Sequence, residues 1–133
     1  MFKRLLTTPI AMLATVFGLT GLTAACSQSA DPAQIAALAA VEQGATLIDV
    51  RSAAEFSGGH LPSALNIVHT EIVAGAARAG LTKDTEIVVY CRSGNRSGAA
   101  KASLEAAGFT RVTNAGAYGD LLSAKAALKA SGS

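Results

Sequence analysis

The chain has 133 residues, which is enough for one small domain. Its formal net charge is +2, but two of its 11 basic residues, Lys3 and Arg4, stand in an apolar leader. Without them, nine basic residues balance nine acidic ones. A domain with no net charge does not indicate a nucleic-acid partner.

Residues 1–25 have the layout of a secretory signal. Lys3 and Arg4 are followed by the apolar run Leu5–Thr23, which Pro9 interrupts, and then by two alanines. The pattern predicts a signal peptide that is cleaved after these small residues. Because the apolar run is near the length of a membrane span, an uncleaved anchor is the alternative.

Cys26 directly follows this leader. The segment from Leu22 to Cys26, LTAAC, resembles the lipobox of bacterial lipoproteins, although the large apolar residue usually stands where Thr23 is here. We therefore expect an exported, periplasmic protein whose Cys26 is lipidated and held at a membrane, with residues 26–31 as a tether. Ordinary signal-peptidase cleavage near Ala25 is the alternative.

Helix and strand signals alternate along residues 32–133, the expected domain. Asp31 and Pro32 form an N-cap followed by proline at the first helical position, and Gly44 ends this helix. Helices are expected over Ala33–Gln43, Ala53–Ser57, Glu71–Ala79, Arg96–Ala107 and Leu121–Lys129. Strands are expected over Thr46–Val50, Ala64–Val68, Glu86–Tyr90 and Arg111–Asn114. The alternation is typical of an α/β domain whose parallel sheet has helices on both faces.

The segment Thr85–Gly98 joins an apolar strand to an alanine-rich helix through a polar loop. The strand ends at Cys91, and ligands of open α/β sheets bind at this end of the strands. The loop consists of Arg92, Ser93, Gly94, Asn95, Arg96 and Ser97. Its backbone N–H groups, the helix N-terminus and two arginines would together attract an anion. The sequence therefore predicts an anion-binding loop around a thiol.

Cys91 is a nucleophile only when its sulfur is ionised, and a free thiol has a pKa of about 8.5. Lowering that pKa by about two units requires about 2.7 kcal/mol. A helix terminus contributes about 0.3–1 kcal/mol, whereas a hydrogen bond to a charged acceptor contributes about 1.5–3 kcal/mol. The loop amides must therefore supply most of the stabilisation, and Gly94 and Gly98 allow the backbone angles that turn them inward. An inert core thiol is the alternative, but the surrounding polar residues favour a reactive one.

Two motifs together resemble the rhodanese family of sulfurtransferases, and in particular its small exported single-domain members of the phage-shock type. Leu47–Ile67, LIDVRSAAEFSGGHLPSALNI, is similar to the opening segment of the family. Cys91–Ser97, CRSGNRS, is similar to its active-site loop. The resemblance spans about Ala36–Lys125 and implies a rhodanese-like α/β domain with a parallel sheet of about five strands.

The resemblance also implies an activity and roles for individual residues. Cys91 would carry a sulfane sulfur as a persulfide, from a small anionic donor such as thiosulfate to a thiophilic acceptor such as cyanide or a thiol. The amides of residues 92–97 would hold the terminal sulfur, Arg92 would attract the donor and Arg96 would brace the loop. Asp49 and Arg51 would lie near the loop and support it, although a simple ion pair at the end of a strand is an equally good interpretation.

The sequence departs from the family pattern at two places. Ser63 follows Pro62, where the family often has glycine. After the last expected strand, the family often has a Leu-x-Gly-Gly element followed by tryptophan. Here the residues are Asn114–Tyr118, NAGAY, and the chain has no tryptophan. The Asn-Ala-Gly start fits the phage-shock type. The departure leaves undetermined which residues form the wall of the pocket, and hence which acceptor the protein uses.

Other functions receive less support. Cysteine phosphatases place five residues between the cysteine and the arginine of their loop, whereas four residues separate Cys91 from Arg96 here. A Cys–His hydrolase would need His60, which we expect to hold a turn, or His69, which we expect at the surface. No metal-ligand spacing surrounds Cys91, so we expect neither a metal nor another cofactor. A non-catalytic binding module remains an alternative, and we expect no disulfide between Cys26 and Cys91.

Overall fold

The computed structural model describes residues 30–132. The predicted signal peptide, Cys26 and most of the tether therefore lie outside the described residues. Within residues 30–132, no helix combines the length and the hydropathy needed to cross a lipid bilayer.

A sheet of four parallel strands forms the centre of the domain. The strands are β1 (Thr46–Asp49), β2 (Leu65–Asn66), β3 (Ile87–Cys91) and β4 (Val112–Ala117). Their order is β2-β1-β3-β4, so the strand that ends in the cysteine has a neighbour on each side. The predicted α/β fold with a parallel sheet is confirmed, with four strands in the described part of the chain instead of about five.

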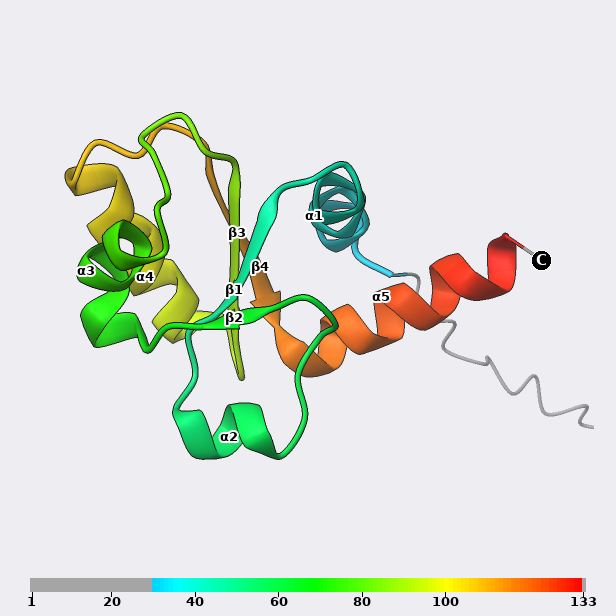
Figure 1. Cartoon of the computed structure of the whole chain (residues 1–133). Helices are drawn as coiled ribbons and strands as arrows, with labels where there is room; N and C mark the ends of the chain where they lie inside the picture. Colours follow the sequence, from blue (N-terminus) through cyan, green and yellow to red (C-terminus); the bar gives the residue numbers. More distant parts are fainter. Residues whose placement is uncertain (1–29, 133) are drawn as a thin grey trace, which may run out of the picture.

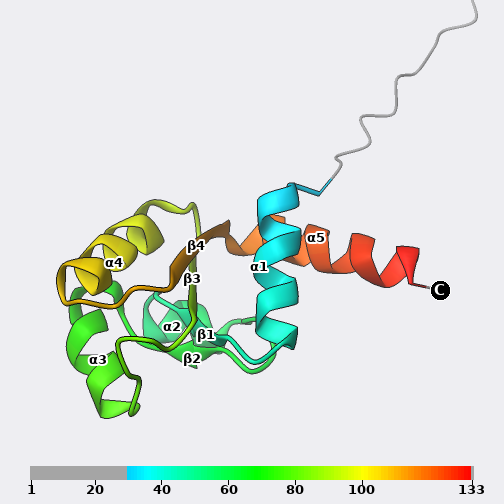
Figure 2. The same cartoon turned by 90° about the horizontal axis from the view of Figure 1, so that it is seen from above.

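Helices cover both faces of the sheet. They are α1 (Pro32–Glu42), α2 (Ala53–Ser57), α3 (Ile72–Arg78), α4 (Asn95–Ala106) and α5 (Tyr118–Ser131), with a 3-10 turn, η1 (His69–Glu71), before α3. Figures 1 and 2 show α3 and α4 on one face, α1 and α5 on the other, and α2 at the end of the sheet. The predicted cap of α1 is present, because the Asp31 carboxylate accepts a hydrogen bond from the Ala33 amide at 2.9 Å.

Strand β3 supplies side chains to two separate hydrophobic clusters. Ile87, Val89 and Cys91 pack in the cluster beneath α3 and α4, whereas Val88 and Tyr90 pack in the cluster beneath α1 and α5. Side chains alternate between the faces of a strand, and all five are buried. The thiol is thereby directed toward the face that carries α4.

Most predicted elements exist within one or two residues of their expected ends, but β2 is much shorter than expected, and one end each of β4 and α5 differs by three residues. The predicted strand Ala64–Val68 is reduced to the two residues of β2. Beyond β2 the chain stays beside β1, because the Ile67 amide donates to the Asp49 carbonyl at 3.1 Å. The Asn66 side-chain amide also donates to the Asp49 and Arg51 carbonyls, at 3.1 and 3.0 Å. The predicted strand Arg111–Asn114 continues to Ala117 by means of a bulge. Helix α5 begins at Tyr118, three residues before its expected start.

Candidate functional site

The sulfur of Cys91 lies at the carboxyl end of β3, at the start of the predicted anion-binding loop. Cys91 has no exposed surface. The Gly94 amide donates a hydrogen bond to the sulfur at 3.0 Å, and the Ser97 hydroxyl lies 3.4 Å from it. Burial by itself is consistent with an inert core thiol, the alternative given in the sequence analysis. The two polar donors at the sulfur argue against that alternative, because such donors stabilise a thiolate.

Gly94 gives the loop its shape. It is the N-cap of α4 and has a φ of +92°, in the left-handed region that glycine adopts without strain. This conformation turns the chain into the helix while its amide faces the sulfur. The amino end of α4, with its partial positive charge, therefore begins beside Cys91.

The pKa of Cys91 reflects two opposing effects. Burial alone would raise it, because an ionised sulfur loses solvation in the interior. Hydrogen bonding from the Ser97 hydroxyl, and from the amides of Ser97, Ser93 and Gly94, lowers it. The hydrogen bonds prevail, and the pKa of the Cys91 thiol lies below its ordinary value. The Ser97 hydroxyl has the largest lowering effect, ahead of the loop amides, to which the sequence analysis assigns most of the stabilisation. That assignment stays a prediction.

The two loop arginines occupy different surroundings. Arg92 is exposed, as are Ser93 and Asn95, and within residues 30–132 its guanidinium forms no ion pair. Arg96 donates two hydrogen bonds, of 2.8 and 2.9 Å, to the Glu55 carboxylate of α2. Arg92 is thus available to an anion at the mouth of the loop, whereas Arg96 ties the loop to the rest of the domain. These positions agree with the roles proposed for both residues, which stay predictions.

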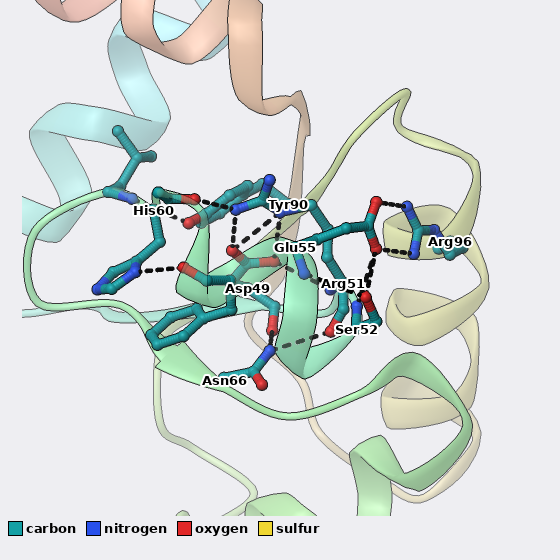
Figure 3. A network of polar contacts seen from close by, with 11 residues as sticks. Asp49, Arg51, Ser52, Glu55, His60, Asn66, Tyr90 and Arg96 are labelled. Atoms are coloured by element: carbon teal, nitrogen blue, oxygen red, sulfur yellow. Dashed lines mark hydrogen bonds and ion pairs between the residues drawn. The ribbon is translucent and has the colours of Figure 1, made fainter.

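Glu55 is a supporting residue that was not predicted from the sequence. It forms a capping box with Ser52: the Ser52 amide donates to the Glu55 carboxylate at 3.0 Å, and the Glu55 amide donates to the Ser52 hydroxyl at 3.3 Å. The same carboxylate binds Arg96 (Figure 3). The Ser-x-x-Glu spacing indicates the capping box, but no local pattern indicates its partner 41 residues away.

Asp49 and Arg51 form a buried ion pair on the other face of the sheet. The guanidinium contacts the Asp49 carboxylate at 2.6–3.0 Å and donates to the Gly59 carbonyl at 2.6 Å. It also lies 4.4 Å from the centre of the Tyr118 ring and 5.8 Å from that of Tyr90. These partners anchor the chain after α2 and the start of α5. The pair therefore supports the segment that carries Ser52 and Glu55 (Figure 3), and its effect on the loop stays a prediction.

Neither histidine contacts the sulfur in the described part of the chain. His60 stacks on Phe56 with a centroid separation of 3.6 Å, and its Nδ1 lies 2.8 Å from the Phe56 carbonyl, so the ring holds the turn as expected. His69 was expected at the surface, but it is half-buried in η1, and its Nδ1 has no hydrogen-bond partner within residues 30–132. The structure gives a Cys–His hydrolase no support.

Residues of β4 form a wall beside the loop. Val89 of β3 pairs with Asn114, but Tyr90 pairs with Gly116, so Ala115 is an additional residue in a bulge. A Cβ added to Gly94 would lie 3.5 Å from the Gly116 Cα, which shows how closely β4 approaches the loop. This wall comes from the segment in which the sequence departs from the family pattern.

The fold and the site define a class of protein: a small parallel α/β domain that holds a buried cysteine at the carboxyl edge of its sheet, in a polar loop that leads into a helix. The family described as the Rhodanese-like domain matches residues 32–116. The chain therefore belongs to the rhodanese family, in agreement with the resemblance found in its sequence. At the level of the family, its function is sulfur transfer.

Individual relatives agree with this assignment. The chain is 38% identical over 74 residues to the thiosulfate sulfurtransferase PspE of Escherichia coli K12, covering 56% of this chain and 71% of PspE. It is 41% identical over 71 residues to the thiosulfate sulfurtransferase GlpE of Pseudomonas savastanoi, covering 53% of this chain and 65% of GlpE. The predicted family, with likeness to the phage-shock type, is confirmed.

Solved structures show the same fold. A structure described as a rhodanese with anions from E. coli has a TM-score of 0.54 and 37% identity, and the match covers 56% of this chain and 88% of that one. The human single-domain sulfurtransferase TSTD1 has a TM-score of 0.56 and 31% identity, covering 68% of this chain and 90% of that one. The rhodanese-like fold is thus confirmed by sequence and by structure.

Proposed function

We propose that this chain is a thiosulfate sulfurtransferase-like enzyme whose sulfur carrier is Cys91. The observation that carries the proposal is the pair of donors on the Cys91 sulfur, the Gly94 amide and the Ser97 hydroxyl, at 3.0 and 3.4 Å. Donors that stabilise a negative charge on this sulfur also suit the terminal sulfur of a persulfide, which is anionic. No group of the loop has to act as a base, because the thiol is held toward its ionised form.

The reaction has two steps. In the first, the Cys91 thiolate attacks the outer sulfur of thiosulfate; a sulfur–sulfur bond forms to Cys91, and the bond to the inner sulfur breaks with its electron pair on the departing sulfite. In the second, cyanide or a thiolate attacks the terminal sulfur, and the Cys91 thiolate leaves. Arg92 attracts the anionic donor at the mouth of the loop, while Arg96 stays paired with Glu55.

Access to the sulfur requires movement, because Cys91 has no exposed surface in this conformation. We expect this movement at the exposed residues Arg92 and Ser93, because the Gly94 amide has to stay on the sulfur that it stabilises.

Formation of thiocyanate from thiosulfate and cyanide tests the proposal. We expect turnover by the wild-type domain, none by Cys91→Ala, and unchanged turnover by Cys26→Ser, which replaces the other cysteine of the chain. Mass spectrometry after incubation with thiosulfate alone should find one additional sulfur on Cys91. Turnover by Cys91→Ala would contradict the proposal, and hydrolysis of a phosphate ester without sulfur transfer would favour a phosphatase.

We also propose that the protein is exported to the periplasm and anchored there through a lipid on Cys26. The support is the basic start, the apolar run and the Ala-Ala-Cys boundary of the sequence. The mature protein should fractionate with membranes and need detergent for release, whereas Cys26→Ser should stay an unprocessed precursor or become soluble. Freely soluble mature protein with an unmodified Cys26 would contradict the anchor and leave the assignment of Cys91 unaffected.

A further inference from the structure

The Gly94 carbonyl accepts hydrogen bonds from two different elements. The Gly98 amide donates to it at 3.0 Å as the first hydrogen bond of α4, and the Asn114 side-chain amide of β4 donates to it at 3.2 Å. The Ser97 hydroxyl lies 3.0 Å from this carbonyl and 3.4 Å from the Cys91 sulfur, so its single proton serves one of the two acceptors at a time. The same Asn114 side chain accepts a hydrogen bond from the Gly116 amide at 2.9 Å. Asn114 therefore connects the wall formed by β4 to the loop around the thiol.

The bulge in β4 brings Asn114 to this position. Asn114 is the last β4 residue that pairs regularly with β3, and the additional residue, Ala115, follows it. Gly116 then has a φ of +84°, and its amide turns back to the Asn114 side-chain oxygen. One side of the Asn114 amide group is thus fixed by the bulge, which leaves the other side directed at the loop.

Gly94 is held on both sides of its Cα. Its amide donates to the Cys91 sulfur at 3.0 Å, and its carbonyl accepts from the Gly98 amide within α4 and from Asn114, its side-chain donor from outside α4 among residues 30–132. The amide and the carbonyl of Gly94 belong to different peptide planes, and a glycine has wide freedom in the two backbone angles that join them. The helix bond from Gly98 alone therefore leaves the residue free to rotate, and the second donor, from β4, restricts that rotation. We propose that Asn114 is a positioning residue for Cys91: it fixes the Gly94 carbonyl and thereby keeps the Gly94 N–H directed at the sulfur.

This inference rests on the proposed function, because it takes Cys91 as the reacting group. Its test compares wild type, Asn114→Ala and Asn114→Asp, with Thr113→Ala as a matched control from the neighbouring exposed position of β4. The rate of alkylation of Cys91 by iodoacetamide is measured from about pH 5 to pH 10. Arg92 and Arg96 of the loop, and Glu55 that pairs with Arg96, are the same in all four proteins.

We expect Asn114→Ala to raise the apparent pKa of Cys91 and to slow alkylation at about pH 6 by roughly three- to tenfold, as for a weakened hydrogen bond to a charged acceptor. At about pH 10 the thiol of both proteins is ionised, so the rates should be similar there. Asn114→Asp should shift the pKa at least as far, because it removes the donor to Gly94 and adds a negative charge. Thr113→Ala should behave like wild type.

Two results would overturn the inference. The first is an unchanged pH profile in Asn114→Ala, or in the isosteric Asn114→Asp if the alanine variant does not fold. The second is a rate that changes by the same factor at every pH, because this would mean altered access to the sulfur and not an altered thiolate. Turnover with thiosulfate and cyanide is measured separately. Its absence in wild type would contradict the proposed function, while the alkylation profiles would still decide the role of Asn114.

Discussion

Glu55 accepts hydrogen bonds from two segments that are far apart in the chain, and Glu55→Gln weakens both connections. The side chain binds the Ser52 amide within its own capping box and the Arg96 guanidinium at the start of α4. Glutamine keeps the size of the side chain but removes its charge and one acceptor oxygen. We therefore expect the variant to fold with lower stability, because α2 and the loop around Cys91 are less firmly connected.

The expected loss follows from the exposure of the pair. The side chains of Arg96 and Glu55 are 31% and 28% exposed. Fully exposed ion pairs contribute about 0–1 kcal/mol, and hydrogen bonds with an ionised partner contribute about 1.5–3 kcal/mol. A partly covered two-bond pair lies between these cases, so we expect the free energy of unfolding to fall by about 1–2 kcal/mol.

The effect should also depend on pH in one direction. Hydrogen bonding to Arg96, followed by that to the Ser52 amide, holds the pKa of Glu55 far below its ordinary value of 4.5. A carboxylate with a lowered pKa stabilises the fold at neutral pH, and this stabilisation is lost as acid protonates it. The stability difference between wild type and Glu55→Gln should thus be largest at about pH 7 and should shrink steadily below about pH 4.

Urea unfolding of wild type, Glu55→Gln and Glu71→Gln, measured at about pH 7 and again below about pH 4, tests this reasoning. Glu71 pairs with Arg78, but their side chains are 67% and 68% exposed, so the control should change stability by less than about 0.5 kcal/mol at either pH. Equal losses in the two variants at neutral pH would refute the reasoning. So would a loss in Glu55→Gln that persists unchanged in acid, because the carboxylate charge would then not be its cause.

Three further changes have defined outcomes. Ser63 has a φ of +65°, so Ser63→Gly should raise the free energy of unfolding by about 1 kcal/mol, and a destabilised variant in thermal unfolding would contradict this. A Cβ on Gly75 would lie 2.2 Å from the Ile67 Cγ2, so Gly75→Ala should cost about 1–3 kcal/mol. Gly119 has open space around it, and Gly119→Ala is the matched control, which should not destabilise the protein. Arg92→Ala should raise the KM for thiosulfate and reduce the dependence of the rate on ionic strength; unchanged kinetics would mean that this side chain does not attract the donor.

The parts of the fold that sequence predicts well are those with local signals. Asp31 and Pro32 mark the start of α1 by residue type alone, and the run from Ile87 to Tyr90 marks a buried strand. The position of Cys91 after that run places it at the carboxyl edge of the sheet without any knowledge of the other strands. The loop and its relation to α4 could therefore be predicted from about a dozen consecutive residues.

The parts that sequence did not predict depend on contacts across the chain. The continuation of β4 beyond Asn114 contains alanine and glycine, which have low strand propensity, and it exists because β3 lies beside it. The partner of Glu55 is 41 residues away, and the half-buried position of His69 follows from the way η1 packs. No pattern within a short window contains this information.

The alternation of side chains along β3 makes the pairing of this strand decisive for activity. Tyr90 and Cys91 are adjacent in sequence but face opposite sides of the sheet. A slip of one residue against β1 would exchange them, placing the phenol beneath α4 and the thiol among the apolar side chains beneath α1 and α5. A molecule misfolded in this way would have no thiol in the loop. Because the proposed function depends on that thiol, sulfur transfer would then also report how faithfully this one strand has paired.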